Sequence, residues 1–285
     1  MTTSLTNNKG ALVLFDFASA FPSMSQEYML ELLTTLGVPP NAMNMIQALY
    51  HNNKCLIQTN GAQIDGFKMS TGVRQGCPLS PLLYAICAEI LIERIRMEIP
   101  SAIVRAYADD TAVLLQDLQR DAPTLAKIFA DFGSMSNLHL NLNKTVITPL
   151  FPQPELAAVR EALTRLIPSW SAVQFAYNAR YLGFILGPGA GDQGWKHPTH
   201  KSLQRAQAWS DRQIGLHCTL TCYNVFALPV LTYIAQLLPP PQQTLQAEST
   251  AMQKMHLDLP TGYPTLTSSG YDTSLDIHAH WHLSH

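Results

Sequence analysis

Apolar runs and isolated polar residues alternate along the first two thirds of the chain in patterns typical of strands and helices. Residues 11–15 form an unbroken apolar run that ends at Asp16, which predicts a buried strand ending in a carboxylate. Two further apolar runs flank the adjacent acids Asp109 and Asp110 and predict a hairpin with both carboxylates at its tip. Asn60-Gly61 predicts a second hairpin, because this dipeptide suits a two-residue turn between strands.

Apolar residues spaced three and four apart predict helices between these strands. The expected helices cover residues 25–36, 42–50, 81–97, 122–135 and 155–166, and then 200–214, 223–237 and 244–257. Ser25 and Ser80 are expected to cap two of them. A further hairpin is expected between residues 175 and 186, with its turn at 177–179. The glycines of residues 187–191 mark a boundary, after which the chain is expected to be helical.

Composition limits the class of protein. The 285 residues are 47% hydrophobic and carry a net charge of −2, which predicts a globular protein without a broadly basic surface. Any contact with nucleic acid is then expected to depend on local basic patches or on metal-bridged phosphates. Five scattered cysteines and the lack of a signal-peptide pattern indicate an intracellular protein, in the cytoplasm or the nucleus. No apolar run reaches the ~18 residues of a membrane span, so no membrane partner is expected.

Two polar clusters in the first half of the chain have both a structural and a functional interpretation. Asp109-Asp110 is either a solvated turn or a site for a divalent cation, since Mg²⁺ selects hard oxygen ligands. The loop 72–81 is either a plain connection or a ligand contact. Arg74 and Gln75 lie between glycines there, a combination that suits close contact with phosphates and bases.

Two clusters in the last third also have a structural and a functional interpretation, and the structural one is preferred for both. Basic residues on the helix near residue 200 form either a solvated face or a contact for a phosphate backbone; they are Lys196, Lys201, Arg205 and Arg212. The chain ends in alternating histidines, which could bind zinc but lack accompanying cysteines at ligand spacing; they are His278, His280, His282 and His285. An unstructured tail from residue 261 is the preferred interpretation of this end.

Five motifs occur in one order along the chain. They are FDFASAF (15–21), GVRQGCPLSP (72–81), AYADD (106–110), LNLNKT (140–145) and YLGFIL (181–186). Together they resemble the reverse transcriptase domain of non-LTR retrotransposons, closely over residues 11–187 and loosely beyond. The resemblance implies an α+β fold, with a right-hand polymerase palm over residues 1–187 and part of the fingers in 22–75. A helical thumb-like region would follow at 188–260.

The resemblance also implies roles for individual residues. Asp16 and Asp109 would bind two Mg²⁺ ions, with Asp110 assisting and Mn²⁺ as another suitable metal. Lys144 would donate a proton near the pyrophosphate. The remaining residues would contact nucleotide or primer: Phe17, Phe21, Gln75 and Gly76 at the incoming nucleotide, and Tyr181, Leu182 and Gly183 in a hairpin that grips the primer end. The implied partners are an RNA template, a DNA primer and dNTPs, with the ring of Phe21 selecting deoxynucleotides.

The chain departs from the family pattern in two places. Pro22 stands where many relatives carry a further Asp. Only about ten residues precede the first motif, where the family places most of the fingers, so a truncated or inactive copy that extends primers poorly is expected. A non-catalytic RNA-binding protein that keeps the palm as a scaffold is the main alternative, although a scaffold has no physical need for clustered acids. An RNA-templated RNA polymerase is a third, against which the ring of Phe21 argues.

Overall fold

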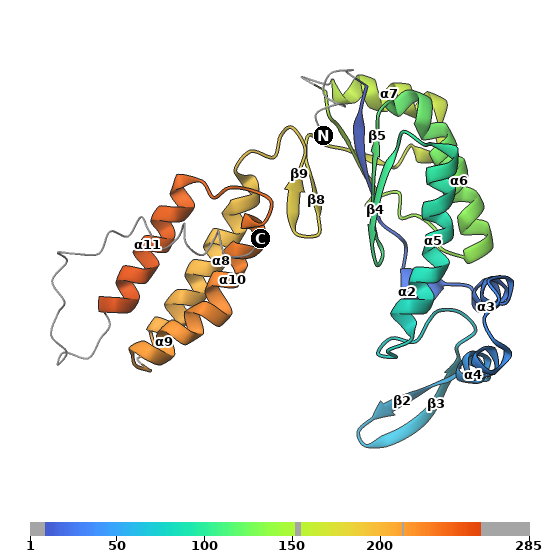
Figure 1. The fold of residues 1–285 in the computed structure, drawn as a ribbon, viewed down its shortest axis with the longest axis horizontal. Helices are drawn as coiled ribbons and strands as arrows, with labels where there is room; N and C mark the ends of the chain where they lie inside the picture. Colours follow the sequence, from blue (N-terminus) through green and yellow to red (C-terminus); the bar gives the residue numbers. More distant parts are fainter. Residues whose placement is uncertain (1–8, 152–154, 213, 258–285) are drawn as a thin grey trace. The chain divides into compact units, whose positions relative to one another are not determined.

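The structure is a computed structural model that describes residues 9–151, 155–212 and 214–257 (Figure 1). The chain forms two compact units, Met1–Gln193 and Gly194–His285. The tail predicted to be unstructured, with its four histidines, lies outside the described residues.

A five-stranded sheet in the order β4-β5-β1-β6-β7 forms the centre of the first unit. Its strands are β1 (Ala11–Phe15), β4 (Ile103–Tyr107), β5 (Asp110–Leu115), β6 (Val146–Pro149) and β7 (Gln174–Phe175). All neighbours pair antiparallel except β6 and β7, which run parallel. The α+β fold class expected from the sequence is confirmed.

The strand β1 is buried along its whole length because both faces of the sheet are covered. Val13 and Phe15 belong to the main core, whereas Leu12 and Leu14 belong to a smaller cluster on the opposite face. This arrangement explains why residues 11–15 are apolar without alternation, as a strand covered on both faces requires.

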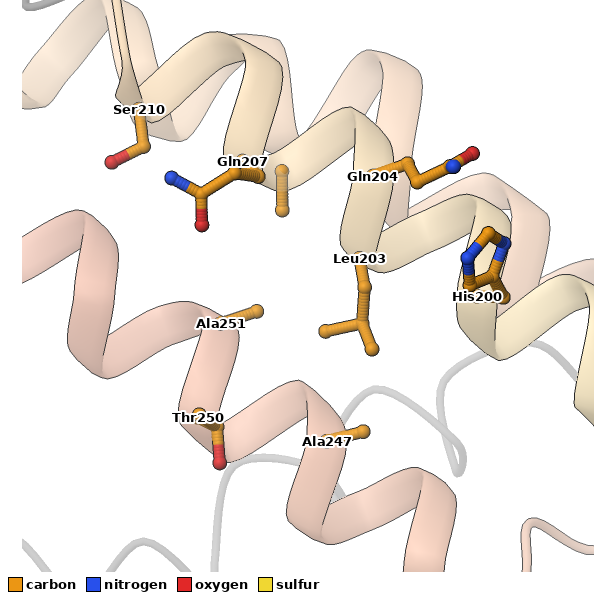
Figure 2. Close-up of a pocket in the computed structure, with 9 residues that line it drawn as sticks. His200, Leu203, Gln204, Gln207, Ser210, Ala247, Thr250 and Ala251 are labelled. Carbon is orange, nitrogen blue, oxygen red and sulfur yellow. The ribbon is translucent and has the colours of Figure 1, made fainter.

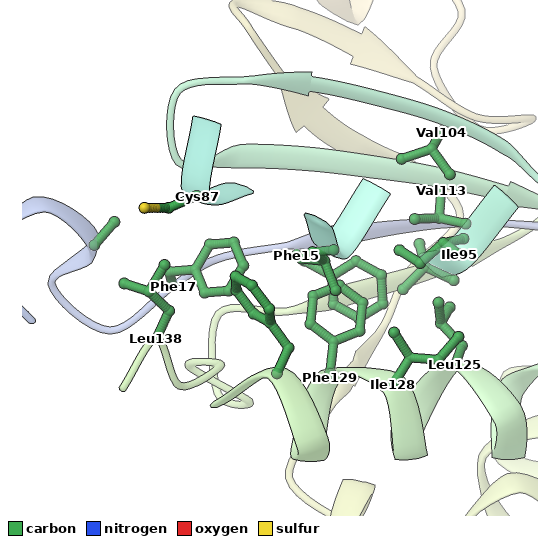
Figure 3. Packing of buried hydrophobic residues seen from close by; sticks show 14 of the residues in the cluster. Phe15, Phe17, Cys87, Ile95, Val104, Val113, Leu125, Ile128, Phe129 and Leu138 are labelled. Carbon is green, nitrogen blue, oxygen red and sulfur yellow. The ribbon is translucent and has the colours of Figure 1, made fainter. Parts of the chain in front are cut away.

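Helices pack on the main-core face of the sheet and position the loops around it (Figure 1). The helices of this unit are α2 (Ala20–Ser23), α3 (Gln26–Thr35), α4 (Pro40–Tyr50), α5 (Ser80–Glu98), α6 (Leu118–Ser136) and α7 (Leu156–Leu166). The rings of Phe15 and Phe129 lie 4.2 Å apart between their centroids, which joins β1 to α6 (Figure 3). The backbone N–H of Tyr28 donates to the Ser25 hydroxyl, so the predicted cap of α3 is confirmed.

The predicted hairpin at Asn60-Gly61 is also confirmed, with strands β2 (Lys54–Thr59) and β3 (Ala62–Lys68). Both turn residues have positive φ, 47° and 78°, as a turn that matches the strand twist requires.

The predicted hairpin with its turn at 177–179 is wrong. Phe175 lies in β7, and the hairpin instead joins β8 (Ala179–Tyr181) to β9 (Phe184–Leu186). Its turn is Leu182-Gly183, where both residues have positive φ. The Asn178 side chain, expected in the turn, instead donates to the Gly189 carbonyl over 2.9 Å.

The predicted cap at Ser80 is wrong as well. Leu79 is the N-cap of α5 and makes no side-chain capping hydrogen bond, while Ser80 is the first helical residue. Pro81 then falls in the first turn of the helix, where its missing N–H costs nothing.

The second unit consists of helices. They are α8 (Gln193–Ser210), α9 (Leu216–Cys222), the π-helical turn η2 (Tyr223–Ala227), α10 (Leu228–Ala235) and α11 (Gln242–Leu257). A pocket of about 380 Å³ is lined by residues of α8 and α11, including Leu203 and Ala251 (Figure 2). Arg205 donates to the Phe226 carbonyl and Arg212 lies over the Trp209 ring, so these two cations already have contacts within the unit.

The expectation that no segment is long enough to span a membrane needs correction. The continuous helical run His217–Ala235 is sufficiently long and apolar by length and composition, and 28% of its most apolar part is buried. The sequence count missed it because scattered Thr and Asn residues interrupt the apolar run without ending the helix. A single helix of this kind is weak evidence for a span, since the core helix of a soluble protein has the same composition.

Truncation of Leu125 on α6 tests the core packing, because this side chain is fully buried (Figure 3). We expect Leu125→Ala to lower the free energy of unfolding by about 2–5 kcal/mol through lost burial and a new cavity. The matched control is Met135→Ala on the same helix, whose side chain is 50% exposed. Urea unfolding measures both, and equal losses in the two variants would contradict this account of the core.

Candidate active site

The pairing of β1 with β5 brings two distant acidic positions together. Phe15 pairs with Thr111 in the antiparallel register. Asp16, which follows Phe15, therefore lies beside Asp110, which precedes Thr111. The 94-residue separation in sequence is therefore closed by strand pairing alone, on a strand that the core holds rigidly.

The turn between β4 and β5 contains two residues, Ala108 and Asp109. Tyr107 pairs with Asp110 to close it, and Ala108 has a left-handed φ of 52°. Such a φ costs a residue with a Cβ about 1–2 kcal/mol, which the flanking strand pairs must offset. Of the two adjacent acids, only Asp109 lies in the turn. Asp110, which was predicted at the tip, begins β5.

The surroundings of Asp110 disfavour its charged form. The pKa of Asp110 is raised, first by partial burial and then by the negative charges of Asp109 and Asp16. A cation would relieve this repulsion, and the ammonium group of Lys144 is a cation at the edge of the site. Lys144 Nζ lies 3.8 Å from Asp16 Oδ2, with both side chains substantially exposed.

The position of Lys144 follows from a hydrogen bond to the backbone of Asp16. The Asn141 N–H donates to the Asp16 carbonyl over 2.7 Å, and the Lys144 N–H donates to the Asn141 carbonyl over 3.0 Å. The predicted basic residue is therefore held by backbone contacts next to the predicted acidic one.

A groove of about 480 Å³ contains three of the residues predicted to contact the nucleotide, Phe21, Gln75 and Gly76. We call it the Phe21 groove; its other lining residues are Arg74, Cys77, Pro78, Ser80 and Pro81. The Phe21 ring packs on Tyr84 of α5 with 4.7 Å between the ring centroids, which fixes one wall of the groove.

The two glycines of the loop have different roles. A Cβ on Gly72 would lie 2.5 Å from the Pro22 carbonyl oxygen, so this glycine permits contact with the chain's own backbone rather than with a ligand. Gly76 has a φ of 84° and open space around its missing Cβ, so it is the one that leaves room at the groove.

The predicted primer-grip hairpin lies near the carboxylates. The Tyr181 hydroxyl donates to the Arg105 carbonyl of β4 over 3.3 Å, and the pKa of Tyr181 is raised by burial and then by the charge of Asp110. Leu182 and Gly183 form the turn of that hairpin. Phe17 differs from the other predicted residues: its side chain is buried and packs towards Phe129, so it can contact a nucleotide only through its backbone.

One residue of the site was not singled out from the sequence. Tyr84 supports Phe21, its hydroxyl has no hydrogen-bond partner among the described residues, and its pKa is raised by burial and by the charge of Asp109. Nothing in the sequence distinguishes it from the other buried residues of α5.

Within the described ranges, no three His, Cys, Asp or Glu side chains are placed so that they could hold one metal ion. A cation at the carboxylates would thus take only one or two ligands from the protein as the side chains stand. Mg²⁺ commonly binds in this way and takes its remaining ligands from substrate phosphates and water.

Known proteins are similar to this chain in sequence and in fold. The model of the family "Reverse transcriptase (RNA-dependent DNA polymerase)" matches residues 2–186. The Pol polyprotein of the retrotransposable element R2DM from Drosophila melanogaster is 27% identical over 146 residues, 49% of this chain and 14% of the relative. An R2 Pol polyprotein from Popillia japonica is 28% identical over 141 residues, 47% of this chain and 23% of the relative. The chain thus spans less than a quarter of the length of these relatives.

Among solved structures, apo telomerase from Candida tropicalis matches with a TM-score of 0.51 and 12% identity, over 90% of this chain and 49% of that one. Telomerase from the same organism in complex with a fragment of telomeric RNA matches with a TM-score of 0.50 and 11% identity, over 89% and 45%. Identities this low support the fold alone. The family match covers all five sequence motifs, and the retrotransposon relatives agree with it. The chain belongs to the reverse transcriptase family, RNA-dependent DNA polymerases, and is similar to the reverse transcriptase domain of non-LTR retrotransposons.

Proposed function

We propose that this chain catalyses RNA-templated DNA synthesis, transferring dNTPs to the 3′-hydroxyl of a primer. The observation that carries the proposal is the meeting of Asp16 with Asp109 and Asp110 inside the family-matched region. Acids crowded closely enough to raise a neighbour's pKa lower stability unless a ligand uses them, which disfavours a purely structural scaffold.

Asp16 and Asp109 would hold two Mg²⁺ ions, and Asp110 would assist. Carboxylate oxygens are the hard ligands that this ion selects. A cation would offset both the burial and the neighbouring negative charges that disfavour ionised Asp110. Bound there, divalent ions supply activation of the primer hydroxyl and neutralisation of the triphosphate and leaving pyrophosphate. Asp16, which follows the core strand β1, and Asp110, which begins β5, would keep the ions in a fixed position.

Lys144 would move a proton to the leaving pyrophosphate. Its ammonium group is largely exposed and lies at the edge of the carboxylate cluster, 3.8 Å from Asp16. An exposed ammonium in that position also attracts the triphosphate before reaction. The β8–β9 hairpin would hold the primer end, a role supported by the contact between the Tyr181 hydroxyl and β4.

The Phe21 groove would receive the incoming nucleotide. Its aromatic wall is fixed by Tyr84, and Gln75 and Gly76 lie on the same lining. A ring so supported cannot swing aside easily, so it would clash with a 2′-hydroxyl and favour deoxynucleotides. The proposed partners are an RNA template and a DNA primer in an intracellular setting, which the five unpaired cysteines suit.

Asp109→Asn tests the role of the carboxylates in catalysis. The change removes one charge at nearly constant shape, so we expect primer extension to fall about 100-fold or more, as when one electrostatic contact to a transition state is lost. Gel-based extension on an RNA template measures it. The matched control is Asp131→Asn, which removes an acid of α6 that pairs with Arg94 away from the cluster. If Asp109→Asn stays within about tenfold of the parent, Asp109 has no such role.

Phe21→Val tests sugar selection. Removing the ring makes room for a 2′-hydroxyl, so the ratio of dNTP to rNTP incorporation efficiency should fall by about tenfold or more. A tenfold fall corresponds to about 1.4 kcal/mol of lost discrimination. Phe21→Tyr keeps the ring and serves as the matched control. An unchanged ratio in Phe21→Val would show that the ring only packs against Tyr84.

Asp110→Asn tests the repulsion itself. Because the pKa of Asp110 is raised in the folded state, this group lowers stability as pH rises through the folded pKa, and the effect vanishes below the unfolded value of about 4. In EDTA we expect the variant to unfold at a slightly higher temperature than the parent at pH 7, and this gap should close as pH falls towards 4. The gain should stay below about 1 kcal/mol because the group is mostly exposed.

Adding Mg²⁺ should reverse that order. The ion binds the folded parent more tightly than the variant, so the parent should gain more thermal stability from millimolar Mg²⁺. Equal Mg²⁺ responses of the two proteins would remove Asp110 from the proposed metal site.

A further inference from the structure

Arg74 lines the Phe21 groove, and none of the roles proposed above uses its side chain. Two backbone hydrogen bonds fix the loop just before it. The Val73 N–H donates to the Phe21 carbonyl over 2.9 Å, and the Gly72 N–H donates to the Met24 carbonyl over 2.7 Å. The Arg74 side chain itself is exposed. The loop therefore holds an accessible cation on the same lining as the Phe21 ring.

A neutral partner holds the guanidinium of Arg74. Its Nη2 donates to Oδ1 of Asn53, whose side chain belongs to a residue only 7% exposed. An amide accepts this hydrogen bond without cancelling the positive charge, as a carboxylate would. No carboxylate pairs with Arg74 within the described ranges. Other arginines of the first unit do pair with an Asp or Glu; they are Arg94, Arg96, Arg120 and Arg165.

This arrangement has a cost at Asn53. Because a guanidinium carries donors only, the amide must turn its oxygen towards Arg74. Its buried NH₂ group is then left without a hydrogen-bond partner among the described residues. A buried donor without a partner lowers stability. Asn53 therefore fixes Arg74 at the expense of stability, which indicates a purpose other than folding.

Two further cations adjoin Asn53 along the chain. Lys54 and Lys68 lie directly opposite each other in the pairing of β2 with β3, and the Met69 N–H donates to the Asn53 carbonyl over 2.8 Å. Like charges in opposed positions repel. Neither lysine forms an ion pair in the part of the chain that the structure describes, with Asp65 of the same hairpin or with any other acid. The base of this hairpin and the adjoining groove wall thus carry excess positive charge.

We propose that Arg74, held by Asn53, is a phosphate-binding site on the wall of the Phe21 groove. A guanidinium presents planar donors that match the oxygens of a phosphate. The phosphate belongs to the triphosphate of a nucleotide in the groove or to the backbone of an RNA strand, and both sources rest on the proposed function. Asn53 is a positioning residue because it acts through Arg74. Such a site supplies the local basic contact that a chain with a net charge of −2 needs to bind nucleic acid.

Binding in the absence of synthesis tests this site. The probes are dATP with Mg²⁺, followed by calorimetry, and a fluorescein-labelled single-stranded RNA, followed by anisotropy at several NaCl concentrations. We expect Arg74→Gln to weaken binding of at least one probe by about tenfold or more, because a charge-assisted hydrogen bond is lost. The matched control is Arg165→Gln, which removes a cation paired with Glu161 on α7 and should stay within about twofold of the parent.

The two probes distinguish the sources of the phosphate. A loss for dATP alone assigns the site to the triphosphate. A loss for RNA alone, with the salt dependence of binding reduced by about 0.7 in slope for one phosphate, assigns it to the strand. A loss for both supports a site that either phosphate can occupy. Unchanged affinity for both probes in Arg74→Gln, or a parent that binds neither probe, would overturn the proposal.

Asn53→Asp tests how Arg74 is held. The carboxylate keeps the shape and the contact, but it neutralises the guanidinium and removes the unpartnered NH₂ group. We therefore expect this variant to bind the same probe about as weakly as Arg74→Gln and to melt no lower than the parent. The double variant should bind no more weakly than either single variant, since both act through one group. Parent-like affinity in Asn53→Asp would refute the positioning role.

Primer extension separates this inference from the proposed function. A parent that binds a probe through Arg74 but does not extend primers would sink the proposed function and leave the phosphate site standing. A parent that extends primers with the same probe affinities as Arg74→Gln would have the opposite meaning.

Discussion

Partial burial of the Asp110 carboxylate beside the negative charges of Asp109 and Asp16 is the constraint on which the candidate site depends. Asp16 and Asp110 cannot move apart, because the register of β1 against β5 fixes their backbones and the core packs against both faces of β1. The turn at Ala108 adds Asp109 in a conformation that the flanking strand pairs must sustain. The fold thus opposes the electrostatic preference of its own side chains, which is the usual sign of a site built for a ligand.

The same sheet organises the rest of the site. One side of β1 supports α5 and α6, and through α5 it supports Tyr84, which fixes the ring of Phe21. The other side carries the β8–β9 hairpin, whose Tyr181 contacts β4. The groups proposed to hold metal, nucleotide and primer are therefore all positioned by the same rigid sheet. That matters because positioning can account for ~7–11 kcal/mol of a reaction barrier.

Much of this could be predicted from the sequence. Local sequence patterns predicted the strand at residues 11–15, the turn at Asn60-Gly61 and the hairpin at the acids 109 and 110, and the structure contains all three. Two of the failures lie where the partner is distant in sequence. Phe175 pairs with β6 rather than with the hairpin that follows it, and Tyr84 acquires its role only from contact with Phe21. No local pattern encodes either contact.

The measurement that tests the account most directly is primer extension by the purified chain on RNA and DNA templates, with Mg²⁺ and with EDTA. The account predicts slow incorporation of dNTPs that follows the RNA template, requires Mg²⁺ and stops in EDTA. RNA binding without any metal-dependent extension would contradict it and favour a scaffold that has kept the fold without the reaction.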